Sequence, residues 1–336
     1  MDNSETQINR EDPKTKSNTP VFAPKGRFKK FFSSHNIGDL IFERLTLLFA
    51  VLVFLLVILM GYEMYVGSKI SINKFGWSFL TNSVWDPVQE IYGALPIIYG
   101  TIVSSFLALV ISVPLSIGIA VFLSELSPGW LEKPLSFLVE LLAGIPSVVY
   151  GLWGIFVLVP WIRNDVEPFL SEHLGFLPFF TGAPYGFGML AAVLILAIMV
   201  LPIVSSISRD ILKSVPQSQR EAALALGATR WQSTKIVLKD AKSGILGATM
   251  LGLGRAVGET MAVTMVIGNR AVISPSLFDP SYTMASVIAN EFTEATSEMY
   301  LSSLIQLALV LFVLTIIINA LAKLLVWSME RKLRPR

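Results

Sequence analysis

The chain lacks cysteine and carries little charge. Its 336 residues include no cysteine and two histidines, His35 and His173. The absence of cysteine excludes disulfide bonds and thiolate metal sites, and both histidines lie in polar segments where we expect them to be solvated, so we predict no metal site. Charged residues make up 15% of the chain, whereas soluble domains carry about 25%. This scarcity of charge argues against a soluble enzyme.

Long apolar runs replace the missing charge. Apolar residues make up 53% of the chain, and its mean hydropathy is +0.65. A helix needs about 20 mostly apolar residues to cross the hydrocarbon, and only helices satisfy their own backbone hydrogen bonds there within one segment. We therefore predict an all-α polytopic membrane protein of about six transmembrane helices, at 40–65, 95–123, 135–162, 187–209, 243–268 and 301–327. Prolines are expected to end or kink these helices at Pro96, Pro114, Pro146, Pro160 and Pro202.

The domain division follows from these windows. Residues 1–36 are polar and hold no apolar core of a signal peptide, so they predict a disordered tail. Residues 37–94 are predicted to form the first transmembrane helix and a long loop, which sets that helix apart. The main transmembrane domain is predicted at 95–327, followed by a short tail at 328–336.

Lysine and arginine predict the orientation in the membrane. They are concentrated before the first window, in the 210–242 loop and at the C-terminus, whereas the loops at 163–186 and 269–300 are acidic. Because basic loops stay in the cytoplasm, we expect both termini and the 210–242 loop to be cytoplasmic. Membrane lipid is the expected surrounding partner, and no nucleic acid is expected.

The 210–242 loop contains a helix–turn–helix pattern. Pro216 suits the first turn of a helix, Gly227 suits a left-handed helix stop, and Thr229 with Gln232 forms a capping box that starts a second helix. The first helix is rich in alanine, and its small side chains allow close docking against a partner. An amphipathic loop resting on lipid explains the same pattern, so the residues alone leave both interpretations open.

The stretch EAALALGATRWQSTKIVL within this loop resembles the EAA loop of binding-protein-dependent ABC importers. Lys239 stands where the family usually has proline, which is expected to loosen the turn into the fifth helix. In that family the loop, here 216–238, is a coupling helix that fits a cleft on the ATPase. The matching residues are Glu221, Ala222, Ala223, Gly227, Ile236 and Leu238.

Nucleotide chemistry is not expected in this chain. It contains no glycine-rich phosphate loop ending in Gly-Lys-Ser or Gly-Lys-Thr. The resemblance therefore implies that ATP and its Mg are bound by a separate ATPase, and that this chain is no enzyme and binds no cofactor itself.

A charged pair lies in the middle of the fifth window. Arg255 and Glu259 are the only charged residues in the apolar centre of the six windows, and a central Arg costs about 2.5–3.5 kcal/mol on insertion scales. Their spacing of four predicts one shared helix face, above a stripe of small residues at Gly244, Ala248 and Gly252. The pair either neutralises itself and locks helix packing, or lines a pathway in which the Arg fork binds phosphate oxygens. Thr260 adds a hydroxyl beside it.

Two further stretches carry a more specific resemblance. LGLGRAVGETMAVTMVIGN and LLAGIPSVVYGLWG (residues 141–154) are similar to the fifth and third spans of permeases in bacterial phosphate importers. The long N-terminal tail with its extra first span, and the Arg-x-x-Gly-Glu-Thr form of the fifth span, favour the PstC-type subunit of this type-1 ABC transmembrane family, with the PstA-type sister as the alternative. In the third span, Gly144, Pro146 and Gly151 break helix regularity; Ser147 then either faces the anion or merely sits at a kink.

The resemblance implies a MetI-like permease fold in the bacterial inner membrane. It also implies a PstA-type sister permease, a PstB-type ATPase dimer and a periplasmic phosphate-binding protein as partners. The predicted function is ATP-driven import of inorganic phosphate by alternating access, with a pathway at Arg255, Glu259, Thr260 and Ser147. The alternatives are another oxyanion as cargo (sulfate, molybdate or phosphonate), a secondary transporter or channel without an ATPase, and a scaffold that only recruits the ATPase.

Overall fold

The computed structural model describes residues 37–333. The predictions for the tail at 1–36, His35 included, lie outside the described residues. The chain divides into two units, 1–58 and 59–336. The first unit contributes the start of a long helix whose apolar side chains are exposed, and the second contains a helical bundle.

Helices make up about four fifths of the described chain, and its one sheet is a hairpin of two short antiparallel strands. This confirms the all-α prediction. The α-helices are α1 (Ile37–Gly67), α2 (Lys69–Phe75), α3 (Ser78–Thr81), α4 (Leu95–Val121), α5 (Gly129–Gly144), α6 (Ser147–Trp153), α7 (Val159–Trp161), α8 (Glu167–Leu174), α9 (Met189–Ser214), α10 (Gln217–Ala225), α11 (Arg230–Gly258), α12 (Met261–Val266), α13 (Met284–Glu291) and α14 (Glu298–Leu333). The strands are β1 (Trp85–Asp86) and β2 (Ile91–Tyr92), the π-helices are η1 (Phe122–Leu126), η2 (Gly154–Leu158) and η3 (Ile162–Val166), and η4 (Pro178–Phe180) is a 3₁₀-helix.

Within residues 37–333, five helical segments are long and apolar enough to cross a membrane: Leu40–Gly67, Leu95–Leu126, Ser147–Leu174, Met189–Ser214 and Glu298–Ser328. Two predicted windows were wrong as single helices. The window 135–162 is divided between α5 and α6, because Pro146 has extended backbone before α6. The window 243–268 is interrupted after Gly258, as described below. The predicted tail at 328–336 is helical as far as Leu333.

The loop predicted at 163–186 also differs from expectation. The third spanning segment continues through η3 and α8 to Leu174, so helix occupies the first half of that loop. Pro96 lies at the start of α4, whereas Pro114 and Pro202 lie inside α4 and α9. A proline inside a helix removes one backbone hydrogen bond and kinks the helix. Neither Pro114 nor Pro202 ends its helix.

Helix α9 is the packing centre of the bundle. Of its most apolar window, 61% is buried, a larger share than in any other of the five spanning segments. The most extensive contact is with α4, and α5, α11 and α12 also pack on α9. Small residues at helical spacing are buried on α4, which lets neighbouring backbones approach closely: Ser105, Ala108, Ser112 and Ser116. Among them, the Ser116 hydroxyl donates to the Leu201 carbonyl of α9 at 3.0 Å.

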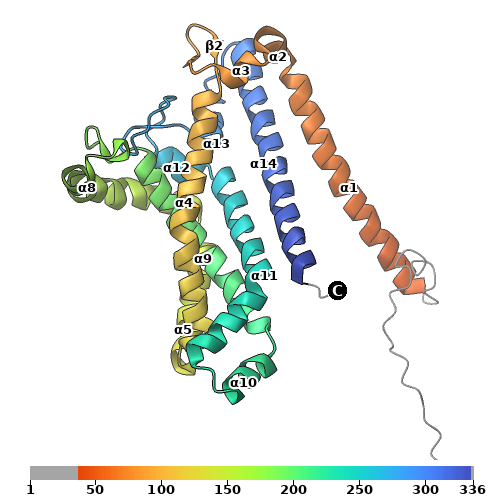
Figure 1. The fold of residues 1–336 in the computed structure, drawn as a ribbon. Coiled ribbons are helices and arrows are strands. Elements are labelled where there is room, and N and C mark those ends of the chain that lie inside the picture. The colour runs from red at the N-terminus through yellow and green to blue at the C-terminus, as the bar shows by residue number, and fades with distance from the viewer. Residues whose placement is uncertain (1–36, 334–336) are drawn as a thin grey trace, which may run out of the picture. The chain divides into compact units, whose positions relative to one another are not determined.

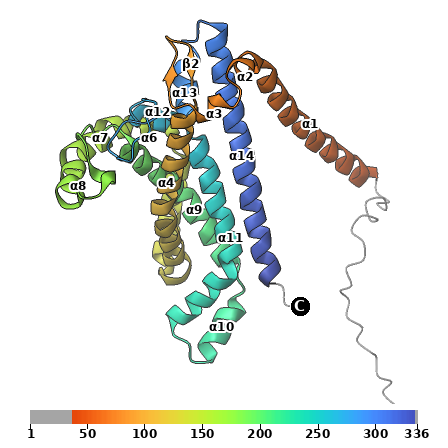
Figure 2. The same cartoon turned by 45° about the horizontal axis from the view of Figure 1, so that its top comes forward.

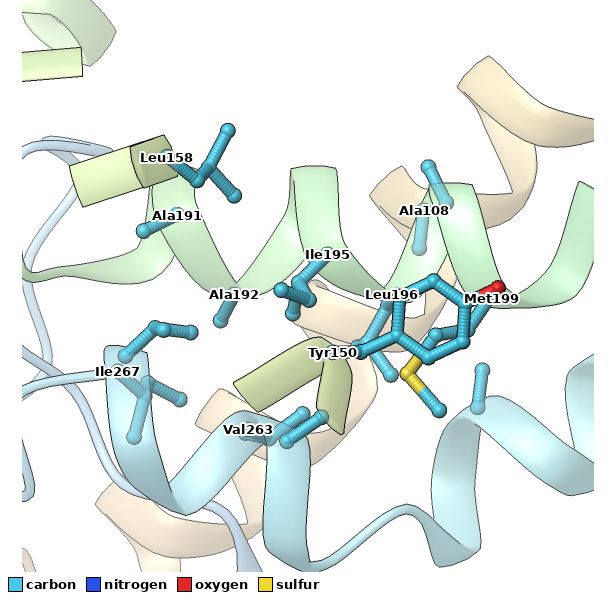
Figure 3. Close-up of a cluster of buried hydrophobic side chains, with 14 of the residues drawn as sticks. Ala108, Tyr150, Leu158, Ala191, Ala192, Ile195, Leu196, Met199, Val263 and Ile267 are labelled. Carbon is cyan, nitrogen blue, oxygen red and sulfur yellow. The ribbon is translucent and has the colours of Figure 1, made fainter. Parts of the chain in front are cut away.

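The main hydrophobic core gathers around α9. Figure 3 shows Ile195 and Leu196 of α9 between Ala108 of α4, Tyr150 of α6 and Val263 of α12. All five side chains are buried. Glycine brings α6 close to α12, since a Cβ at Gly151 would lie 2.4 Å from the sulfur of Met265. The core therefore fixes the place of α12, which follows the charged pair.

The β1–β2 hairpin lies at the end of the bundle opposite to α10 (Figures 1 and 2). Glu291 of α13 holds this end together, because its Oε2 accepts hydrogen bonds from Trp85 Nε1 at 2.9 Å and from the Tyr300 hydroxyl at 2.8 Å. Burial raises the pKa of Tyr92, whose ring stacks on Tyr300, to about 12. The long segment after α1 is thus folded onto α13 and α14.

Close packing of α11 on α9 generates a stability prediction. A Cβ at Gly252 would lie 2.7 Å from Val204 Cγ2 and 2.8 Å from Val200 Cγ1, whereas one at Gly247 of the same helix would meet nothing within 4 Å. We expect Gly252→Ala to destabilise the fold by about 1–3 kcal/mol through overpacking. Gly247→Ala should leave stability unchanged or raise it, because alanine favours the helix. Thermal unfolding of the two purified variants in detergent measures this, and equal midpoints would contradict the packing.

Candidate functional site

A helix break lies within the predicted fifth span. Helix α11 ends at Gly258, Glu259 has extended backbone (φ −70°, ψ 128°), and α12 begins at Met261. Such a break leaves backbone groups without helical partners. Irregular backbone at membrane depth is tolerated where protein or a water-filled cavity surrounds it, so the break is a functional candidate by itself.

The carboxylate of Glu259 occupies this break. The residue is 8% exposed, and its Oε1 accepts a hydrogen bond from the Ala262 N–H at 3.4 Å, at the start of α12. Its Oε2 lies 3.7 Å from Nη2 of Arg255. The prediction of one shared helix face was wrong, because Glu259 lies beyond the end of α11, but the pair itself is present.

Arg255 differs from its partner in exposure. Its side chain is 41% exposed, against 7% for the side chain of Glu259. A buried carboxylate therefore holds one side of a guanidinium whose other donors remain accessible. The sequence left two interpretations of the pair, helix packing and a solute pathway. A packing role explains why Glu259 is buried, but it does not explain why donors of Arg255 remain exposed.

The stripe of small residues on α11 lies against α9. Ala248 and Gly252 are buried, and a Cβ at Gly244 would lie 2.7 Å from Ile211 of α9. The stripe thus lets a helix approach, as the sequence suggested. Because it is occupied by α9, it is not available to a ligand.

Thr260 lies at the break, whereas Ser147 belongs to α6. Thr260 precedes α12, and its hydroxyl donates to the Gly258 carbonyl at 3.3 Å, an unused acceptor at the end of α11. Ser147 is the half-buried first residue of α6, which packs on α12. The described residues show no hydrogen bond or ion pair that joins Ser147 to Arg255 or Glu259.

The third-span motif is irregular only in part. α5 ends at Gly144, and the Tyr150 hydroxyl donates to the Leu142 carbonyl at 2.8 Å, which satisfies one acceptor at that helix end. Gly151 lies inside α6 and serves close packing on α12. The break is therefore at 145–146, before Ser147.

The helix–turn–helix of the predicted coupling loop is confirmed. α10 ends at Ala225, and Gly227 has φ +83°. The N–H of Gly227 donates to Leu224 and that of Ala228 to Ala223, which is a Schellman motif. Thr229 and Gln232 form both bonds of the capping box.

The second helix of this loop differs from expectation. α11 runs without interruption from Arg230 to Gly258, so no turn separates the loop from the fifth span. Lys239, where proline was expected, allows this continuity because it keeps its backbone N–H. Leu238 packs against a hydrophobic cluster at the ends of α4 and α9.

The loop exposes an apolar surface around the turn. Glu221 and Ala222 are exposed and Ala223 is buried. Exposed apolar patches of this kind mark interaction sites. Beside the predicted Ile236, the large apolar side chains exposed here are Leu224, Leu226 and Trp231. These three lie inside the recognised motif, but its spacing did not show which of them point outward.

Buried charges elsewhere were missed from the sequence. Glu125 and Arg209 are buried near the α10 end of α4 and α9, and Glu167 is 1% exposed at the start of α8, where its Oε2 accepts the Gly186 N–H. They do not contradict the prediction of a single charged pair, which concerned the apolar centres of the windows. Each of these residues lies near a window's end or just beyond it, where sequence hydropathy does not distinguish buried from solvated charge.

Several known proteins similar to this chain belong to one family. A family model described as binding-protein-dependent transport system inner membrane component matches residues 112–331. The phosphate transport system permease protein PstC of Pasteurella multocida is 47% identical over 304 residues, which cover 89% of this chain and 95% of the relative. The PstC protein of Haemophilus influenzae is 46% identical over 308 residues, covering 90% and 97%.

A solved structure of the MetNI methionine ABC transporter has the same fold, with a TM-score of 0.53 at 17% identity, covering 73% of this chain and 99% of that chain. This confirms the predicted MetI-like type-1 permease fold. The chain thus belongs to the binding-protein-dependent transport system inner membrane components, among the PstC phosphate transport system permease proteins, and is a multi-pass protein of the inner membrane.

Proposed function

We propose that this chain is the permease subunit of an ATP-driven importer that moves inorganic phosphate inward by alternating access. The observation that carries the proposal is the break between α11 and α12, where buried Glu259 holds the half-exposed Arg255. The identity to PstC proteins supports phosphate as the cargo.

The chemistry of the pair suits a transported oxyanion. A guanidinium presents a planar fork of donors that matches phosphate oxygens. A lone buried cation would hold the anion too tightly, whereas conduction requires release. Glu259 is paired with part of the Arg255 guanidinium, and this pairing would lower the affinity of Arg255 for the anion. The hydroxyl of Thr260 and that of Ser147 are the further donors we assign to the pathway.

The α10 turn is the proposed contact with an ATPase. Its exposed apolar side chains at Leu224, Leu226 and Trp231 would fill a cleft on that subunit, with Glu221, Ala222 and Gly227 on the same turn. ATP and Mg would be bound by the ATPase dimer, which is of the PstB type. This chain then carries out no covalent chemistry.

The remaining partners follow from the same proposal. A PstA-type sister permease would complete the pathway, and a periplasmic phosphate-binding protein would dock at the β1–β2 end. Both termini and α10 would be cytoplasmic, as the distribution of lysine and arginine predicts.

Phosphate uptake by an Arg255→Gln variant tests the pathway. Glutamine keeps a hydrogen-bond donor but loses the charge and the fork, so we expect uptake of labelled phosphate to fall at least tenfold while the ATPase copurifies at the normal amount. The matched control is Arg163→Gln, which removes an exposed arginine outside the break. Unchanged uptake in Arg255→Gln would disprove the pathway role.

Substitutions at Gly227 test the docking turn. Nothing lies within 4 Å of a Cβ built at this glycine, so a substitution acts through its φ of +83° rather than through a clash. Valine in this conformation costs about 1–2 kcal/mol, whereas asparagine tolerates it. We expect Gly227→Val to reduce the amount of ATPase that copurifies and Gly227→Asn to retain most of it. Equal copurification of both with the unmodified chain would count against the docking role.

A further inference from the structure

Three ion pairs connect the segment formed by η1 and α5 with the segment formed by the end of α9 and α10. They join Glu125 to Arg220, Glu132 to Lys213, and Glu140 to Arg209. From one pair to the next, the residue number of the acidic member rises along η1 and α5, whereas that of the basic member falls from α10 into α9. The two segments therefore run antiparallel. We call these three pairs the ion-pair ladder.

The three pairs differ in their exposure to solvent. In the Glu125–Arg220 pair the side chains are 8% and 13% exposed, whereas in the Glu132–Lys213 pair they are 32% and 41% exposed. The hydrogen bond from Lys213 holds the pKa of Glu132 below its ordinary value. Exposed pairs are screened by salt and contribute little. In the Glu140–Arg209 pair, Glu140 is 55% and Arg209 8% exposed. The Glu125–Arg220 pair is therefore the one of the three in which both side chains are shielded from solvent.

Arg220 of α10 bonds to two other elements at once, η1 and the end of α9. Its Nε and Nη2 donate to both oxygens of Glu125 in η1, at distances down to 2.7 Å. Its Nη2 also donates to the Leu212 carbonyl at 2.8 Å, and its Nη1 to the Val215 carbonyl at 2.7 Å. These two carbonyls lie at the end of α9, where a helix leaves its last acceptors unpaired. One side chain of α10 thus joins the ends of α4 and α9.

Apolar contacts contribute little to the connection between α10 and the ends of α4 and α9, which depends largely on the Arg220 side chain. The cluster beneath it consists of residues of α4, α9 and α11 together with Val215. The helix α10 is only nine residues long, and of its residues only Ala223 is buried. α10 packs on α11, and Arg220 is the side chain through which it bonds to η1 and to the end of α9.

From this geometry we propose that Arg220 and Glu125 are positioning residues, through which a displacement of α10 is passed to α4 and α9. The proposal rests on the proposed function, in which α10 contacts the ATPase. The guanidinium of Arg220 donates to four acceptor oxygens. These bonds resist displacement of α10 both toward and away from α4 and α9, whereas an apolar contact resists only movement toward them. Without the pair, ATP hydrolysis continues and α10 stays joined to α11, but its displacement is no longer passed to α4 and α9.

Uptake of phosphate per ATP hydrolysed, measured in the full reconstituted complex, tests this coupling. Glu125→Gln removes the charge and keeps the side-chain volume, and Glu132→Gln is the matched control in the exposed pair. We expect Glu125→Gln to lower uptake per ATP at least tenfold with less than a twofold change in copurified ATPase. Glu132→Gln should change that ratio less than twofold.

The double variant Glu125→Gln/Arg220→Gln separates coupling from general damage. Residues that act as one unit give non-additive losses, so the double variant should be no worse than the more impaired single variant. Additive losses, or equal falls in uptake and ATP hydrolysis, would overturn the proposal. If Glu125→Gln does not accumulate, Glu125→Asp replaces it, with a smaller fall in uptake per ATP expected and parallel losses again contradicting the proposal.

Failure of the proposed function gives a different result. In that case the complex of the unmodified chain would show neither phosphate uptake nor a copurifying ATPase. If the unmodified complex transports phosphate and Glu125→Gln behaves like Glu132→Gln, only the positioning role of the pair is refuted.

Discussion

Close packing against α9 is the constraint on which the rest of the structure depends. α4, α5, α11 and α12 all contact this helix, and small residues on α4 and α11 allow their backbones to approach it. In lipid, helices gain stability from such packing rather than from exclusion of water. Because α11 is fixed along its buried stripe, its end at Gly258 is fixed as well. The break and the charged pair therefore have a defined place on a rigid support.

The break and the α10 turn lie at opposite ends of one continuous helix. α11 begins beside the turn at Arg230 and ends beside Glu259, so one uninterrupted helix connects the proposed ATPase contact with the proposed phosphate site (Figure 1). Arg220 joins the turn to α4 and α9 as well. A displacement of α10 would consequently reach the pathway along more than one helix, which alternating access requires.

The sequence predicted those parts of the structure that depend on residues close together in the chain. Gly227, Thr229 and Gln232 specify their turn and cap through neighbours in the chain, and the structure has both. The break at Glu259 was missed, because hydropathy averages over a break of two residues, whereas the proline at Pro146 signalled the break before α6. Arg220 gave no signal, since its partner Glu125 lies 95 residues away and only the tertiary fold brings the two together.

The central claim is that phosphate, delivered from outside, drives ATP use through this permease. It is tested most directly by the rate of ATP hydrolysis in the complete complex in liposomes, with the binding protein loaded with phosphate, sulfate, molybdate or phosphonate. The account predicts stimulation by the phosphate-loaded protein and none by the others. Equal stimulation by another oxyanion, or no stimulation by phosphate, would contradict it.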